Sequence, residues 1–170
     1  AKISSSVEIG PYSIIGPDAH ISEHCLINVN SCVAHDSKLG RYSVLSPYCV
    51  INGRANVGES FFMGTHSSLF PMVKVGDNCK LSGHTFINSN VIIGKNCIIN
   101  TGSIIEHDVN ISDNCHISTG TILNGTVSVG KNTFIGSGSI IKNDIKIGDE
   151  CIIGMGKIVT KNIPNKKIIK

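Results

Sequence analysis

The sequence predicts an all-β fold, a parallel β-helix whose short strands wind into about nine triangular coils. Three observations predict it: a period of six residues runs through the chain, small residues recur two positions before each large one, and aromatic residues make up only 5% of the chain. Every sixth residue from Ile3 to Val159 is Ile, Val, Leu or Met, without an insertion or deletion. Such a period is typical of repeat architectures whose units stack on one another.

Each six-residue unit reads as a short strand followed by a corner. The large aliphatic residue and the small residue two positions before it, such as Ser13 or Thr121, point inward because side chains alternate along a strand. The residue after the aliphatic is Gly eleven times and Asn five times. Both types accept positive φ, so we expect the tight corner at this position. Three units then close one coil of about 18 residues.

The units form one domain, a single continuous β-helix over residues 1–164 with a basic C-terminal tail over residues 165–170. An internal duplication runs through it, with copy one over about 1–80 and copy two over about 81–164. The two copies are offset by four whole coils: His35-Asp36 and Asn52-Gly53 return as His107-Asp108 and Asn124-Gly125. We therefore expect both His-Asp pairs on the same corner of the prism.

Composition argues against several classes of function. The net charge is only +3 and the dense basic stretch lies in the tail, which gives little support to nucleic-acid binding. No apolar run approaches the roughly 20 residues that span a bilayer, and no signal peptide begins the chain, so we expect a cytoplasmic protein without membrane contact. We expect no metal site, because six of the seven cysteines occupy the small inward position as reduced core thiols. These six are Cys25, Cys49, Cys79, Cys97, Cys115 and Cys151.

His107 is the strongest candidate for chemistry. It lies two residues past the inward Ile105, outside the core alternation, and Asp108 follows it. Imidazole suits proton transfer near neutral pH, and an adjacent carboxylate fixes its tautomer and raises its basicity. A solvated corner residue is the ordinary interpretation of a histidine in this fold. The neighbouring Glu106, with His116 nine residues further on, favours a general base at His107 instead.

These motifs resemble a known family. The stretches 99–108, 116–118 and 135–138 look like those of the hexapeptide-repeat acetyltransferases that act on bacterial sugars. The resemblance is closest to the sialic acid O-acetyltransferase and UDP-4-amino-sugar N-acetyltransferase family. It implies a left-handed β-helix, a homotrimer, acetyl-CoA as co-substrate and a small-molecule sugar as acceptor.

The resemblance also implies roles for individual residues. His107 would be the general base that deprotonates the sugar amine or hydroxyl, with Asp108 strengthening it. His116 would contact the thioester end of acetyl-CoA. The rest of the co-substrate would lie against backbone groups in a groove between two subunits; the corresponding residues are Gly125, Ser137, Gly138, Met155 and Gly156.

The chain departs from the family pattern in ways that leave two functions open. It begins in a coil at Ile3 without the family's N-terminal sugar-binding domain, and it looks like two β-helix domains fused in register. Copy one has Val44 and Tyr48 where copy two has His116 and Gly120, so we expect chemistry at His107 and only a relic site at His35 and Asp36. One function is an acetyl-CoA-dependent acetyltransferase acting on an amine or hydroxyl of a bacterial sugar or nucleotide sugar. The alternative is a β-helix scaffold, natural or an engineered fusion, that derives from such enzymes and lacks turnover.

Overall fold

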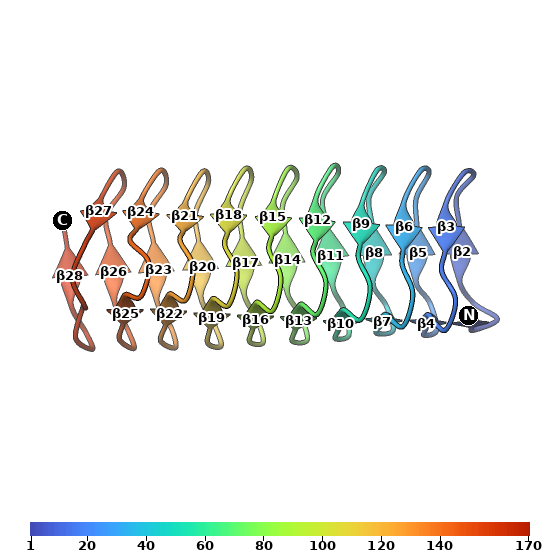
Figure 1. The fold of residues 1–170 in the computed structure, drawn as a ribbon, viewed down its shortest axis with the longest axis horizontal. Coiled ribbons are helices and arrows are strands. Elements are labelled where there is room, and N and C mark those ends of the chain that lie inside the picture. Colours follow the sequence, from blue (N-terminus) through green and yellow to red (C-terminus); the bar gives the residue numbers. More distant parts are fainter.

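The computed structural model describes all residues 1–170 as a three-sided prism of stacked coils (Figure 1). All strands are parallel and no helix is present, which confirms the predicted left-handed parallel β-helix of about nine coils. Each strand inside a sheet pairs with the equivalent strand of the coil before it and of the coil after it, as Phe86 does with Ser68 and Ile104. One coil therefore advances the chain by one strand spacing, about 4.8 Å.

The strands form three sheets, one on each side of the prism, and each strand holds two residues. Sheet A contains β1 (Lys2–Ile3), β4 (His20–Ile21), β7 (Lys38–Leu39), β10 (Asn56–Val57), β13 (Lys74–Val75), β16 (Ile92–Ile93), β19 (Asn110–Ile111), β22 (Ser128–Val129) and β25 (Lys146–Ile147). Sheet B contains β2 (Glu8–Ile9), β5 (Leu26–Ile27), β8 (Val44–Leu45), β11 (Phe62–Met63), β14 (Lys80–Leu81), β17 (Ile98–Ile99), β20 (His116–Ile117), β23 (Phe134–Ile135), β26 (Ile152–Ile153) and β28 (Ile168–Ile169). Sheet C contains β3 (Ile14–Ile15), β6 (Cys32–Val33), β9 (Val50–Ile51), β12 (Ser68–Leu69), β15 (Phe86–Ile87), β18 (Ile104–Ile105), β21 (Ile122–Leu123), β24 (Ile140–Ile141) and β27 (Ile158–Val159). We call the three edges the AB, BC and CA corners, in the order in which the chain turns from one sheet to the next.

The core consists of the two inward columns that the sequence predicts on each sheet. From Ile21 to Val159 every aliphatic of the six-residue series is buried, and the six inward cysteines are buried with them. Their thiols donate hydrogen bonds to backbone carbonyls, as Cys79 does to Gly94 O at 3.0 Å and Cys115 to Gly130 O at 3.0 Å. All seven cysteines are free thiols, and no group of His, Cys, Asp and Glu side chains is arranged to hold a metal ion.

The corner prediction was wrong in detail. Positive φ falls two residues beyond the predicted position, for example at Tyr48 (φ 61°) and His84 (φ 58°). The glycine after the aliphatic is required for a different reason, which is close approach between coils. A Cβ on Gly10 would lie 2.6 Å from the backbone nitrogen of Val29, and one on Gly16 would lie 2.7 Å from that of His35.

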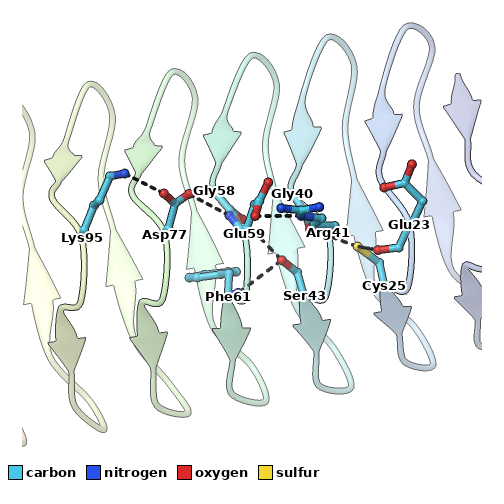
Figure 2. A network of polar contacts seen from close by, with 10 residues as sticks. All are labelled: Glu23, Cys25, Gly40, Arg41, Ser43, Gly58, Glu59, Phe61, Asp77 and Lys95. Atoms are coloured by element: carbon cyan, nitrogen blue, oxygen red, sulfur yellow. Dashed lines mark hydrogen bonds and ion pairs between the residues drawn. The ribbon is translucent and has the colours of Figure 1, made fainter.

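Two ion pairs lie one after the other along the AB corner (Figure 2). Arg41 pairs with Glu59 at 2.8 Å, and Lys95 pairs with Asp77 at 2.8 Å. Asp77 also accepts a hydrogen bond from the Glu59 backbone N–H at 3.1 Å. The Lys95 ammonium and then this backbone N–H hold the pKa of Asp77 below its ordinary value.

Phe61 lies inside the prism behind this corner, in a column otherwise made of small side chains (Figure 2). It is 1% exposed, and its backbone N–H donates to Ser43 Oγ at 3.3 Å. The same coil supplies Ala55 and Val57 as smaller inward residues. Phe61 is thus the one aromatic side chain in a core of aliphatics and thiols.

The two ends of the prism differ. At the C-terminal end, the segment expected as a tail includes β28, which pairs with β26, and the half-buried Ile169 packs against the core. At the N-terminal end, the inward Ile3 and Ile9 remain 47% and 41% exposed. No helix has the length and hydrophobicity that a membrane crossing would need.

We expect amide hydrogen exchange in the chain of residues 1–170 to be fastest over residues 3–20 among the coils, because Ile3 and Ile9 are exposed and β1 pairs only with β4. Amides around Ile105, which lie well inside the stack with coils on either side, serve as the internal reference. Exchange measured by mass spectrometry on peptides from both regions checks this. Equal protection of the two regions would show that another contact covers the first coil.

Candidate active site

His107 and Asp108 form a hydrogen-bonded pair at the CA corner, directly after β18. His107 Nδ1 lies 2.8 Å from Asp108 Oδ2. A carboxylate can only accept, so Nδ1 carries the proton and the neutral ring keeps a lone pair on Nε2. The Cα of Gly125, one coil later, lies under the ring: a Cβ there would meet His107 Cε1 at 2.7 Å and Nε2 at 2.8 Å. The corner thus presents an exposed imidazole with a fixed tautomer. Gly125 lies directly beneath the ring, and we call it the glycine floor.

Asn90 supports the pair from the preceding coil. Its Nδ2 donates to Asp108 Oδ1 at 3.1 Å, so both carboxylate oxygens are occupied. The hydrogen bond from His107, and after it the one from Asn90, holds the pKa of Asp108 below its ordinary value. A depressed folded-state pKa means that ionised Asp108 stabilises the fold above the ordinary pKa. This contribution is lost as the pH falls through the folded-state value.

Replacing Asn90 by alanine is expected to raise the pKa of Asp108 toward its ordinary value, because one of the two hydrogen bonds to the carboxylate is removed. His107→Ala should raise this pKa further, since His107 is the larger cause. A carbon-13 NMR titration of the carboxylate measures both. Asn96→Ala is the matched control, because Asn96 makes a similar amide contact, to Asn114 at 3.0 Å, on the AB corner. A shift in the control as large as that in Asn90→Ala would contradict this role for Asn90.

A shallow groove opens beside His107 toward the C-terminal coils. Its volume is about 430 Å³, and none of its lining residues is hydrophobic. It is lined by Glu106, His107, Asn124, Gly125, Thr126, Asn143 and Asp144. Glu106 is held by Asn88 Nδ2 at 2.8 Å, and Thr126 donates from Oγ1 to Asp144. The wall is therefore rich in hydrogen-bond acceptors, which suits a polar ligand with hydroxyl or amino groups.

The first copy repeats this geometry at the same corner, four coils earlier. His35 Nδ1 lies 2.8 Å from Asp36 Oδ2, and a Cβ on Gly53 would meet His35 Nε2 at 2.5 Å. The surroundings differ, because Arg54 and Met72 stand where the second copy has Thr126 and Asp144. No comparable polar groove forms at His35.

His116 lies elsewhere on the prism. It is the outward residue of β20 on sheet B, half a coil after His107, whereas His107 lies on the corner between sheets C and A. Its ring packs edge-on against Phe134, with ring centroids 5.2 Å apart. Nε2 is shielded from solvent without a hydrogen-bond partner, so Nδ1 is the nitrogen that a ligand can reach. Within one chain, the two histidines therefore lie on different sides of the prism.

The remaining predicted co-substrate residues, Ser137, Gly138, Met155 and Gly156, lie together on the BC corner beside sheet B. Gly138 and Gly156 belong to a run of four corner glycines with positive φ, which we call the glycine strip: Gly102, Gly120, Gly138 and Gly156. Twenty-two corner positions reach positive φ with other residue types, and a Cβ at any glycine of the strip would meet nothing within 4 Å. Neither φ nor packing therefore accounts for the strip. Over about 14 Å, the positive-φ position of this corner carries no side chain.

The structure thus divides the predicted site residues into two groups. His107, Asp108 and Gly125 meet at the CA corner, whereas His116 lies with Ser137, Gly138, Met155 and Gly156 along sheet B and the BC corner. Sequence reasoning missed Asn90, Thr126, Asn143 and Asp144. Three of them could have been found by counting coils, because Asn90, Thr126 and Asp144 fall one coil before, one coil after and two coils after Asp108.

Comparison with known proteins adds to this picture. A family profile described as the hexapeptide repeat of succinyl-transferase matches residues 90–124 and 126–161. A search of curated protein sequences found no significant match.

Several solved structures share the fold. UDP-N-acetylglucosamine acyltransferase from Campylobacter jejuni is 22% identical with a TM-score of 0.57, covering 95% of this chain and 68% of that chain. The corresponding acyltransferase from Francisella novicida is 14% identical with a TM-score of 0.60, covering 91% and 64%. GDP-perosamine N-acetyltransferase from Caulobacter crescentus is 25% identical with a TM-score of 0.58, covering 74% and 51%. That last structure is a histidine-to-alanine variant in complex with CoA and GDP-perosamine. This chain spans between about half and two thirds of the length of these three proteins.

Proposed function

Because this chain is a hexapeptide-repeat β-helix protein similar in fold to acyltransferases of sugar nucleotides, we propose that it is an acetyl-CoA-dependent acetyltransferase. The acceptor is an amine or hydroxyl of a bacterial sugar or nucleotide sugar. The observation that carries the proposal is the His107–Asp108 pair, with its free Nε2 over the glycine floor of an acceptor-rich groove.

His107 is the general base in this proposal. Nε2 takes the proton from the amine or hydroxyl as that group attacks the thioester carbonyl carbon. His107 then returns the proton to the sulfur of the leaving CoA, so charge and protons balance over one turnover. Asp108 holds the Nδ1–H and stabilises the imidazolium while it exists. No covalent bond to the protein forms, so positioning of the two substrates and base catalysis supply the rate.

The glycine strip fits the long arm of acetyl-CoA. The strip is smooth, exposed and about 14 Å long. The backbone N–H groups of Ser137 and Met155 make no hydrogen bond within the chain, so each can donate to a carbonyl of the arm. His116 lies on sheet B next to the BC corner, and its Nδ1, the nitrogen that is not shielded from solvent, is the group proposed to contact the thioester end.

A complete site needs more than one copy of the chain. His107 lies at the CA corner and His116 on sheet B, so we propose a homotrimer in which His107 of one chain meets the partner subunit's His116. The outward faces support such an assembly. Sheets B and C expose apolar side chains such as Phe62, Phe134 and Phe86, whereas sheet A exposes mainly lysine and polar residues.

Calorimetric titration with acetyl-CoA tests the proposal directly. Saturable binding that Gly138→Leu abolishes is the expected result, because a leucine side chain would fill the glycine strip and strain the positive φ of 68°. Absence of binding, together with no thioester cleavage in the presence of 4-amino and hydroxyl sugars, would favour the scaffold alternative.

Subunit complementation tests the shared site. His107→Ala and His116→Ala chains are each expected to be nearly inactive alone, and to regain about a quarter of the wild-type rate when refolded together. Random mixing makes three quarters of the trimers mixed, and each mixed trimer then holds one intact site of three. Thioester cleavage measured before and after mixing checks this. A mixture as inactive as its components would contradict a site shared between chains.

A further inference from the structure

A second groove lies on the CA corner and sheet A, toward the N-terminal end from His107. Its volume is about 460 Å³, and its lining residues are Arg54, Met72, Lys74, Asn90 and Ile92. It contains two cations and no carboxylate. Neither Arg54 nor Lys74 takes part in an ion pair, although the chain's other arginine, Arg41, is paired with Glu59. The acidic residue one coil below Arg54 is Asp36, whose Oδ2 is bonded to His35.

Asn90 joins this groove to the site at His107. It lines the groove and donates to Asp108, which in turn holds His107. Arg54, Met72, Asn90 and Asp108 occupy the same corner position in four successive coils. Three coil spacings therefore separate Arg54 from Asp108, about 14 Å along the prism axis. Lys74 precedes His107 by just under two coils, which places it about 9 Å below His107.

The proposed position of the acyl donor favours the N-terminal stretch of the CA corner as the place for the acceptor. The glycine strip extends from the level of His107 toward the C-terminal coils, so a donor lying on it occupies that direction. On the CA corner itself, the groove on the C-terminal side of His107 is lined by the carboxylates Glu106 and Asp144, which would repel phosphate. An acceptor that places its amine or hydroxyl at His107 Nε2 then has the N-terminal stretch of the CA corner for its phosphate groups. The two unpaired cations lie along that stretch.

Resting on the function proposed above, we infer that Arg54 and Lys74 bind the phosphate groups of a phosphorylated acceptor sugar, such as a nucleoside diphosphate sugar. Across a pyranose ring, six bonds separate an amine on C4 from the nearest phosphorus atom, a span of about 7 Å. Eight bonds separate this amine from the second phosphorus atom, a span of about 10 Å. Adding about 3 Å for the hydrogen bond to Nε2 places the two phosphates about 10 and 13 Å from His107. These distances fall between the levels of Lys74 and Arg54.

The chemistry of the two side chains suits this ligand. The guanidinium of Arg54 can bind two phosphate oxygens at once, and the Lys74 ammonium supplies a mobile point charge. The internal duplication offers a comparison within the same chain. At the equivalent positions of the second copy, Lys146 matches Lys74 but Thr126 replaces Arg54, so that copy holds no such cation pair.

Binding of uridine diphosphate tests the inference without requiring turnover. Wild-type protein should bind it in a calorimetric or NMR titration, and Arg54→Gln and Lys74→Gln should each weaken binding about tenfold, the loss of one hydrogen bond to a charged group. Lys146→Gln is the matched control on the same column of sheet A and should bind as wild type. Absence of binding to wild-type protein, or unchanged binding in both groove variants, would overturn the inference. A loss confined to Lys146→Gln would show that the phosphates lie in the opposite direction.

Kinetics separate this inference from the proposed function. With a nucleoside diphosphate 4-amino sugar, Arg54→Gln should raise KM about tenfold with little change in kcat, while the same amino sugar without phosphate should show no difference between variant and wild type. A general defect with both acceptors would contradict a phosphate-binding role. If uridine diphosphate binds as expected but no acceptor is acetylated, the groove assignment stands and the proposed reaction fails.

Discussion

Replacing His107 by alanine is expected to slow sugar-dependent cleavage of acetyl-CoA by a factor of about 10² to 10⁴, the usual contribution of a general base. His35→Ala should leave the rate unchanged. The two histidines form a closely matched pair, because each lies 2.8 Å from the following aspartate and over a glycine one coil later. Any general effect of losing a corner histidine would therefore appear in both variants.

The difference arises from what surrounds each pair. His107 borders the groove lined by Thr126 and Asp144, and the same coil carries His116 and Gly120. Copy one has Arg54, Met72, Val44 and Tyr48 at the equivalent positions. The exposed Tyr48 ring stacks on His66, with ring centroids 4.8 Å apart, and so fills the corner that the glycine strip leaves free. A rate lost in His35→Ala and kept in His107→Ala would reverse the assignment of the two copies.

Replacing Phe61 by alanine is expected to reduce the free energy of unfolding by about 3 to 5 kcal/mol, the range observed for truncating a buried aromatic side chain. Phe61 is 1% exposed, and the neighbouring coils offer Ser43 and Cys79 in its column, both too small to fill the cavity. Each coil is stabilised mainly by its neighbours, so the loss should affect the middle of the prism.

Phe62→Ala is the control for that measurement. Phe62 is the next residue, points outward from sheet B and is 39% exposed, so the same truncation should cost less than half as much. Urea unfolding followed by circular dichroism compares the two variants. Equal destabilisation would mean that Phe62 is covered, or that Phe61 is not packed as the structure shows.

The sequence predicts the fold well because the same six-residue pattern of inward and outward side chains repeats without interruption. Alternation along each strand and the six-residue period together place Ile105 and Cys115 inside and His107 outside, as the structure has them. The corner was misplaced because Gly10 and its equivalents look like residues chosen for positive φ, whereas they are required by the backbone of the next coil. The residue type alone does not distinguish a glycine needed for positive φ from a glycine needed because a Cβ would collide with the next coil.

The candidate site could be predicted only in part, because some of its contacts join residues of different coils, which are distant in the sequence. Adjacent residues such as His107 and Asp108 can be recognised as a pair from the sequence. Asn90 supports them from one full coil away, and only the stacking of coils makes that contact visible. The separation of His107 from His116 follows from the three-sided cross-section, in which a step of half a coil leads from a corner to the opposite face.

The stacking of the coils also limits how such a protein can select its ligands. Backbone hydrogen bonds, 106 in all, fix the interval between one coil and the next. Equivalent residues of successive coils are therefore held at a fixed spacing of about 4.8 Å along each edge. A prism of this kind has no hinge about which two halves could close over a substrate. We therefore expect ligands to be selected by the distance between their reacting group and their charged end, and this distance can change only in steps of one coil when a charged side chain moves along the edge.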